Sequence, residues 1–581
     1  MASSDGAGSA APAPATLVGA LDQGTTSTRF ILFDAATGTP VASHQVTHDQ
    51  HYPHPGWVEH DPLEILKCAE QCIDGAVAEG GVDVATVKAI GITNQRETTV
   101  VWDKESGQPL CNAIVWLDTR TRSTCEKLRE RIDVERVRKL CGLPISTYFS
   151  GVKLRWLMDH RPAVKEALDA GTALFGTIDT WLVWNLGGRT THATDVTNAG
   201  RTMLMDIHTL DWNDELIAAV GVPRSCLPTI RSCAESYGKM AGTVLKGVPI
   251  SGVVGDQQAA LVGQSCLRVG EAKATYGTGC FLIVNTGDTP VFSSKGLLTT
   301  PAYKLGPTSP AVYALEGSIA IAGAAISWLK DNLHLIHTAH EVEGLASSVK
   351  DAGDVYFVPA FSGLFAPRWR QDARGTIVGL TQYTTAAHIV RATLEAIAFQ
   401  VMEVLRAVGE DLHSSGVTAA AGGGGNSGGG GGAEASDSDG SFKSSDTTSF
   451  IREVRVDGGA SVNNLLMQMQ ADLVGAPVLR PVVVETTALG AAFAAGLAEG
   501  VFDSAESLRE KWRLDRRFVP EITPDERARR IGKWEMAVQR SLGWIEHGER
   551  DAEDSDEDQE GGAGESVDAL DAAAGGGGDG K

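Results

Sequence analysis

The sequence predicts an α/β protein of two related domains, and three features of the chain support this prediction. The chain has 581 residues, more than one core ordinarily holds, since domains run to about 100–250 residues. At 17–34 an apolar run, a short polar turn and a second apolar run form the pattern of a strand hairpin. The same pattern recurs at 271–287. The recurrence indicates two domains built on one plan.

The turn of the first hairpin, DQGTTSTR from Asp22 to Arg29, has the composition of a phosphate-binding loop. We expect Gly24 to adopt a backbone conformation closed to other residues, which lets consecutive N–H groups converge on an anion. Asp22 could hold Mg²⁺ through water. Side-chain donors to a phosphate would come from Thr25, Thr26, Ser27 and Arg29. The alternative is a surface hairpin whose hydroxyl groups only satisfy the turn.

The second hairpin contains the turn YGTGC, in which Thr278 and Gly279 would face the terminal phosphates of a nucleotide. Phe281 would then form a wall on the substrate side. Because each domain has such a turn, we expect the two domains to close on one nucleotide from opposite sides. Residues at three later places in the chain would also come close to this nucleotide. They are Gly323, the pair Gly459 and Ala460, and Asn463.

Two polar corners follow predicted strands, and ligands of open α/β sheets bind at such strand ends. The first corner is Asn94 to Glu97, where Arg96 and Glu97 offer donors and an acceptor to a small polyol. The second is Asp256 with Gln257, after the apolar run at 250–254. Asp256 could cap the helix that follows, or it could act as the general base that accepts a proton from an attacking hydroxyl.

Composition excludes several classes of protein. The net charge of −23 argues against a nucleic-acid surface, and no apolar run reaches the length of a membrane span. The nine cysteines form no C-x-x-C pair, which favours reduced thiols. The first residues resemble neither a secretory signal nor a transit peptide. A cytoplasmic protein is therefore the default expectation.

Seven motifs in this order resemble the FGGY carbohydrate kinase family: DQGTTSTR, NQRET, YFSGVKLRW, GDQQAAL, YGTGCF, VDGGASVNN and ALGAA. The resemblance covers roughly 17–546 apart from a Gly-rich insert. It implies two actin-like (ribonuclease H-like) α/β domains around a central nucleotide cleft. It further implies ATP and Mg²⁺ as cofactors and the phosphorylation of glycerol to sn-glycerol 3-phosphate. A homo-oligomer, either a dimer or a tetramer, is also expected.

The motif matches assign roles to individual residues. Asp256 corresponds to the general base and Asp22 to the carboxylate linked to Mg²⁺. The substrate-binding residues would be Arg96, Glu97, Trp116, Tyr148, Asp256, Gln257 and Phe281. The nucleotide-binding residues would be Thr25, Thr26, Ser27, Arg29, Thr278, Gly279, Gly323, Gly459, Ala460 and Asn463. The sequence departs from the family pattern at Arg368, where relatives commonly have an aromatic residue, and at Ser327, where bacterial members have a glutamine.

We expect an N-terminal domain at 17–265 that binds glycerol and phosphate, and a C-terminal domain at 266–546 that binds the nucleotide. The Gly/Ser-rich insert at 414–449 would be flexible, and the extension at 1–16 and the acidic tail at 547–581 disordered. Two other functions fit the same pattern. One is a kinase of the same fold for a longer polyol or a ketose, although Trp116 and Phe281 suggest a small, walled pocket. The other is an actin-like or chaperone-like ATPase that phosphorylates no substrate.

Overall fold

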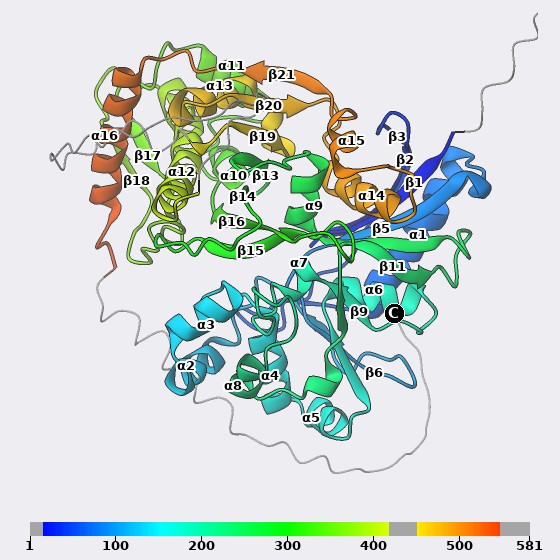
Figure 1. Ribbon diagram of the computed structural model, residues 1–581. Coiled ribbons are helices and arrows are strands. Elements are labelled where there is room, and N and C mark those ends of the chain that lie inside the picture. The colour runs from blue at the N-terminus through cyan, green and yellow to red at the C-terminus, as the bar shows by residue number, and fades with distance from the viewer. Residues whose placement is uncertain (1–14, 418–449, 546–581) are drawn as a thin grey trace, which may run out of the picture.

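Two sheets of the same design form the centres of the two halves of the protein, in a computed structural model that describes residues 15–417 and 450–545 (Figure 1). The expected insert from residue 418, most of the N-terminal extension and the acidic tail lie outside these residues. The first sheet has the strand order β11 (Ala234–Lys239), β12 (Pro249–Gly255), β5 (Val87–Asn94), β1 (Leu17–Gln23), β2 (Ser27–Asp34) and β3 (Pro40–Thr47). The second has the order β15 (Leu298–Tyr303), β16 (Val312–Ile319), β14 (Cys280–Gly287), β13 (Glu271–Tyr276), β19 (Glu453–Asp457), β20 (Val478–Pro481) and β21 (Leu514–Phe518).

The strand pairings confirm that the chain repeats one plan. In the first sheet β1 pairs antiparallel with β2 and parallel with β5, and β12 adds a further parallel strand. In the second sheet β13 pairs antiparallel with β14 and parallel with β19, and β20 adds the next parallel strand. Both predicted hairpins are therefore present, as β1–β2 and β13–β14. Each opens the sheet of its domain.

Helices cover both faces of the first sheet. On one face α1 (Pro62–Gly80) and α6 (Ile178–Leu186) bury apolar side chains against the strands, and Asp61 caps α1 by accepting a bond from the Leu63 N–H. On the other face lie α9 (Asp256–Gly263) and α14 (Thr486–Ala498). Helix α14 comes from the second half of the chain, yet it packs on β1, β5 and β12 of the first sheet. It thus joins the two halves.

A lobe of short helices extends the first domain, at the bottom of Figure 1. It contains α2 (Arg122–Arg131), α3 (Val134–Cys141), α4 (Ser150–His160), α5 (Pro162–Asp169), α7 (Val196–Ala199) and α8 (Asp214–Val220). Its small sheets pair β4 (Glu59–His60) with β7 (Ala113–Ile114), β6 (Val100–Asp103) with β8 (Ala173–Gly176), and β9 (Ala193–Asp195) with β10 (Thr229–Arg231). Backbone bonding seats this lobe on the edge of the second sheet, where the Thr299 N–H donates to the Gly142 carbonyl at 3.1 Å.

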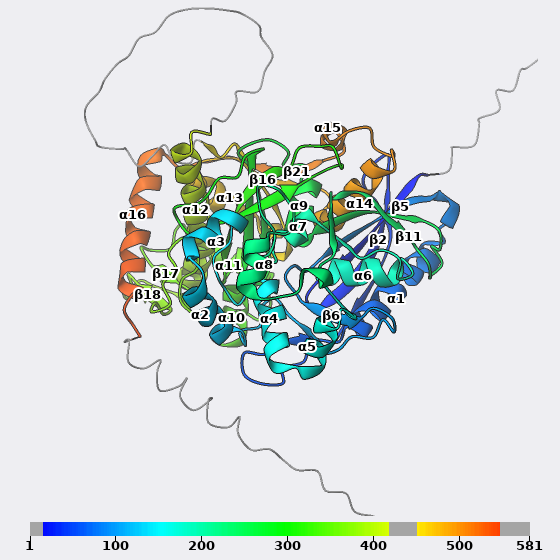
Figure 2. The same cartoon turned by 60° about the horizontal axis from the view of Figure 1, so that its bottom comes forward.

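The core of the second domain is built around the long helix α12 (Ala386–Ser414), which packs on α13 (Asn464–Val474). Figures 1 and 2 both show α16 (Pro524–Ser541) on the outer side of α12, and the rings of Phe399 and Trp534 stack between these helices at 4.9 Å. Arg368 ion-pairs with Glu403 on α12 and Glu535 on α16. The remaining elements are α10 (Gly323–Asp331), α11 (Glu341–Ser347), α15 (Ala505–Arg509), β17 (Tyr356–Val358) and β18 (Thr376–Val378).

Helices α9 and α14 cross at very short range. A Cβ added at Gly490 would lie 1.8 Å from the carbonyl oxygen of Ala259, and one added at Gly263 would lie 1.9 Å from that of Thr486. No side chain fits at either position. The small residues that the sequence shows in this stretch therefore serve close helix packing, and α9 begins with Asp256, so this crossing supports the polar corner there.

We expect Gly490→Ala to destabilise the protein, because the new methyl group must push the two helices apart. Overpacking of this kind costs about 1–3 kcal/mol, more than the higher helix propensity of alanine returns. The matched control is Gly532→Ala on α16, where an added Cβ meets no atom within 4 Å. Thermal melting should show a lower Tm for the first variant and an equal or higher Tm for the second. Equal stability of both variants would contradict the close crossing.

Candidate active site

The two polar corners lie next to each other at one edge of the first sheet. Strands β5 and β12 are parallel neighbours, and their last residues, Asn94 and Gly255, are paired. Arg96 and Glu97 follow the first strand, and Asp256 follows the second. Parallel strands end at the same edge of a sheet, which is where such folds hold ligands.

Arg96 is almost completely buried, with 3% of its surface exposed, and most of its donors are in use. Its Nε lies 3.0 Å from Oδ1 of Asp256. Its Nη1 donates to Glu316 Oε2 at 2.7 Å and to Gln258 Oε1 at 3.1 Å, while its Nη2 donates to Glu316 Oε1 at 2.8 Å. A guanidinium has five N–H groups, and these three hydrogen bonds leave the Nε–H and one hydrogen of Nη2 without a hydrogen-bond partner. Both lie on the same edge of the guanidinium, the edge nearest Asp256.

Asp256 is the first residue of α9 and does not cap it. The cap position belongs to Gly255, which has no side chain to offer. The Asp256 carboxylate instead accepts from the Gln257 N–H at 2.6 Å and faces Arg96. Its side chain is 27% exposed, against 2% for that of Arg96. Of the two interpretations of Asp256, the helix cap is wrong, and an accessible carboxylate held by a buried cation remains.

Glu97 is buried and pairs with Arg201, a residue that sequence reasoning missed. Oε1 of Glu97 accepts a hydrogen bond from Nε of Arg201. Burial raises the pKa of Glu97, while Arg201 and Arg96 oppose this shift. Arg201 is 0% exposed, and its Nη1 lies 3.5 Å from Oε2 of Glu316. Arg96, Glu97, Arg201 and Glu316 thus form one buried charge cluster of two cations and two anions.

Gln257, the other residue of the second corner, contacts a buried lysine. Nζ of Lys273 donates to Oε1 of Gln257 and, at 2.9 Å, to Oγ1 of Thr275. Burial lowers the pKa of Lys273, and the carboxylates of Asp457 and Asp256 oppose this shift. The sequence does hold a signal for Glu316, which is the single charge in the strand Val312–Ile319, and a weaker one for Lys273, which shares its strand with Glu271. Arg201 has no such signal.

Three aromatic side chains from distant parts of the chain meet beside these corners. The ring of Trp116 lies 5.5 Å from that of Tyr148 and 6.3 Å from that of Phe281. The Trp116 Nε1–H donates to Oγ1 of Thr25 at 2.9 Å, which ties this wall to the turn of the first hairpin. The structure therefore brings together the seven residues predicted to bind substrate.

The turn of the first hairpin closes differently from our expectation. The φ angle of Gly24 lies outside the positive range, so the predicted conformation closed to other residues is wrong. The turn closes because the Gly24 N–H donates to the Ser27 carbonyl at 2.9 Å. His48, which follows β3, lies 3.0 Å through Nε2 from the carbonyl oxygen of Thr25. The guanidinium of Arg29 already makes a hydrogen bond to Gln45 and an ion pair with Glu485, so only part of it is open to a phosphate.

The turn of the second hairpin packs on the start of α10. The Ala322 and Ala324 N–H groups donate to the Thr278 carbonyl at 2.9 and 3.0 Å, and the Gly323 N–H donates to Gly277 at 3.0 Å. These bonds bring Thr278, Gly279 and Gly323 together, as predicted for one ligand site.

A 3₁₀ turn at Gly459–Val462 lies beside the end of β13 and adds the remaining predicted nucleotide contacts. Gly458 has a φ of 84°, and a Cβ there would lie 2.5 Å from the carbonyl oxygen of Tyr276, so only glycine fits. A Cβ at Gly459 would meet no atom within 4 Å, so its backbone borders open space. Asn463 caps α13, because its Oδ1 accepts from the Leu466 N–H at 2.9 Å, and this leaves its amide NH₂ group for a ligand.

Asp22 is suited to supply one ligand to a divalent cation that takes most of its ligands from other groups. Burial, together with the nearby carboxylates of Asp256 and Glu485, raises its pKa to about 7, and Arg29 opposes this shift. A bound cation would stabilise the charged carboxylate of Asp22 and so oppose this rise in its pKa. In residues 15–417 and 450–545 no group of three or more acidic, histidine or cysteine side chains is arranged to hold a metal. The surroundings of Asp22 therefore match the way Mg²⁺ binds, through one or two carboxylates, water and phosphate.

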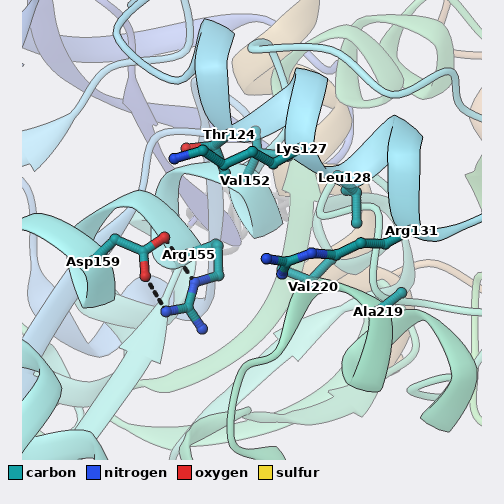
Figure 3. Close-up of a pocket in the computed structure, with 9 residues that line it drawn as sticks. All are labelled: Thr124, Lys127, Leu128, Arg131, Val152, Arg155, Asp159, Ala219 and Val220. Carbon is teal, nitrogen blue, oxygen red and sulfur yellow. Dashed lines mark hydrogen bonds and ion pairs between the residues drawn. The ribbon is translucent and has the colours of Figure 1, made fainter.

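A hollow outside this region lies between α2, α4 and α8 (Figure 3). Its volume is about 30 Å³, room for one or two water molecules, and Arg155 at its rim is paired with Asp159. It is too small for a nucleotide and shares no residue with the two corners. In the parts of the chain that the structure describes, no helix is both long and apolar enough to cross a membrane.

Comparison with known proteins places the chain in a family. The model of the FGGY family of carbohydrate kinases, N-terminal domain, matches residues 17–263, and the model of its C-terminal domain matches residues 272–499. A glycerol kinase from Brucella anthropi is 51% identical over 91% of this chain and 99% of its own, and one from Roseiflexus sp. is 50% identical over 92% and 100%.

Solved structures agree with this placement. The structure of Plasmodium falciparum glycerol kinase with ADP matches at a TM-score of 0.81, with 36% identity over 92% of this chain and 99% of that one. A xylulose kinase from Lactobacillus acidophilus shares the fold at a TM-score of 0.74 and 20% identity, over 90% of this chain and 97% of its own. The expectation of two actin-like domains is confirmed, and this protein belongs to the FGGY family of carbohydrate kinases.

Proposed function

We propose that this protein transfers the terminal phosphate of ATP to glycerol and forms sn-glycerol 3-phosphate. The observation that carries the proposal is the contact between Arg96 and Asp256. The Arg96 donors that make no hydrogen bond lie on the edge nearest Asp256, so a hydroxyl held there would lie beside the carboxylate. The glycerol kinases that are about 50% identical over nine-tenths of the chain support the same reaction.

The acceptor site consists of these two residues with Glu97, Gln257 and the three aromatic side chains. A polyol hydroxyl both donates and accepts, so it needs an acceptor and a donor in reach, which the carboxylates and Arg96 supply. The rings of Trp116, Tyr148 and Phe281 would cover the carbon chain of glycerol and exclude water. Rings this close together would favour a three-carbon polyol over a longer one.

Asp256 would accept the proton of the attacking hydroxyl, while the turns of the two hairpins hold the phosphates of ATP. Mg²⁺ would be held at Asp22, where it would neutralise phosphate charge. Most of the rate enhancement would come from alignment of the hydroxyl and the phosphate and from charge stabilisation, because phosphoryl transfer needs little covalent help from the protein. The remaining nucleotide contacts would come from Thr25, Thr26, Ser27, Arg29, Thr278, Gly279, Gly323, Gly459, Ala460 and Asn463.

Release of ADP in a coupled assay tests the function directly. We expect turnover with glycerol, much less with xylulose, ribulose or gluconate, and almost none without an acceptor. A preference for a ketose or a longer polyol would assign the protein to a different kinase of the same fold. ATP hydrolysis that is indifferent to added polyol would make it an ATPase.

Asp256→Asn should lower kcat by about 10²–10⁴-fold, the usual contribution of a general base, with a smaller effect on the glycerol KM. The amide keeps the size of the side chain but accepts no proton. Asp159→Asn is a matched control, since Asp159 pairs with Arg155 beside the distant hollow. Steady-state kinetics of both variants decide the role, and wild-type turnover in Asp256→Asn would exclude Asp256 as the base.

Asp22→Asn should raise the Mg²⁺ concentration needed for half-maximal activity by about tenfold, because groups that hold a metal through water typically contribute 10–100-fold to its affinity. Asp34→Asn, at the far end of the same hairpin, serves as control, since the Asp34 carboxylate accepts hydrogen bonds from Thr37 of the adjoining turn and lies away from the phosphate turn. Titration of activity with Mg²⁺ at saturating ATP measures the shift. An unchanged Mg²⁺ requirement would remove Asp22 from the metal site.

A cytoplasmic location remains part of the proposal, supported by the nine cysteines, all of which are free thiols. The expected dimer or tetramer stays a prediction. Light scattering of the purified protein would measure its mass in solution.

A further inference from the structure

One row of side chains crosses the second sheet and faces the first domain. Lys273 on β13 is paired with Ile283 on β14, and Ile283 is paired with Glu316 on β16. Paired residues point to the same face of a sheet. Ile283 packs in a core cluster with Val254 and Ala259, which belong to the first domain. Lys273 and Glu316, on either side of it, therefore face the same domain.

Both charged residues of this row are buried, at 0% and 2% exposure. A charge is buried at a high cost unless it is paired and hydrogen-bonded, so each must serve a partner. Glu316 holds Arg96 with two hydrogen bonds and lies 3.5 Å from Arg201. Burial would raise the pKa of Glu316, but Arg201 and Arg96 bring it to about 2, so it is ionised throughout the physiological range.

Lys273 holds Gln257 of the second corner in place, as Glu316 holds Arg96 of the first corner. Its Nζ bonds to Oε1 of Gln257, which fixes the orientation of that amide and turns its NH₂ group away from the lysine. The bond to Thr275 on its own strand holds the ammonium in place. One row of the C-terminal domain thus contacts both polar corners of the N-terminal domain.

We propose that Glu316 and Lys273 are positioning residues through which the C-terminal domain aligns the acceptor site, Glu316 by fixing Arg96 and Lys273 by fixing Gln257. This inference rests on the proposed function. Neither residue needs to touch the acceptor, because each acts through a side chain of the first domain. It follows that the affinity for glycerol depends on contact between the two domains.

Glu316→Gln tests this inference, because the amide keeps the volume but cannot accept both bonds from Arg96. The loss of one charged hydrogen bond corresponds to about tenfold or more in an equilibrium constant, so the glycerol KM should rise by about tenfold or more. The ATP KM should stay within about threefold, since no predicted nucleotide contact involves Glu316. Lys273→Met should raise the glycerol KM in the same selective way, also by about tenfold or more, because the ammonium of Lys273 makes a charged hydrogen bond to Gln257.

Glu403→Gln is the matched control. Glu403 is also a buried glutamate of the second domain that binds an arginine, Arg368, but it lies on α12 and contacts Trp534 of α16. We expect it to lower the Tm and to leave both KM values unchanged. A selective rise in the glycerol KM in this control would overturn the inference, because it would show that any lost buried pair has this effect.

An unchanged glycerol KM in folded Glu316→Gln, or equal rises in both KM values, would also overturn it. If Glu316→Gln does not fold, Glu316→Asp takes its place: it keeps the charge on a shorter stem and should raise the glycerol KM to a smaller extent, and an unchanged value counts against the inference. A wild-type protein that does not phosphorylate glycerol would refute the proposed function and this inference with it. An active wild-type protein together with a Glu316→Gln variant of unchanged glycerol KM would refute this inference alone.

Discussion

The buried guanidinium of Arg96 is the group on which the arrangement of this site depends. It lies between Asp256 on one edge and Glu316 on the other, so that a side chain of each domain is fixed by the same cation. A buried charge left without its partner is costly, by about 3–5 kcal/mol, so the three groups are held together. What remains free on Arg96 is one edge with two donors, the Nε–H and one N–H of Nη2, next to an accessible carboxylate. The proposed chemistry needs this combination of a donor and a proton acceptor.

The duplicated fold explains why these groups meet. In each half, a hairpin opens the sheet and the next parallel strands end in polar or glycine-rich corners. The crossing of α9 and α14 brings the halves so close that glycine is needed on both helices. Asp256 begins one of these helices, and Glu485, which contacts Arg29 of the first turn, precedes the other. The packing that joins the domains is therefore continuous with the site between them.

Much of this architecture could be predicted from sequence, because it depends on local patterns. Apolar runs around short turns located both hairpins, and the strand-to-corner pattern placed Arg96 and Asp256 at strand ends. The contacts of Arg201, Glu316 and Lys273 could not be predicted, since they join residues far apart in the chain. Local pattern also misled at Gly24, whose φ is not positive, and it gave no sign that His48 contacts the first turn. The His48 contact joins residues 23 positions apart in the chain, which no short stretch of sequence records.

A crystal structure with glycerol and a non-hydrolysable ATP analogue would test this arrangement of Arg96 and Asp256. We expect one glycerol hydroxyl within about 2.7–3.2 Å of both Nη2 of Arg96 and the Asp256 carboxylate, the range of a hydrogen bond. The aromatic side chains of Trp116 and Phe281 should flank the carbon chain. Glycerol bound away from Asp256, with only water on the free edge of Arg96, would contradict it.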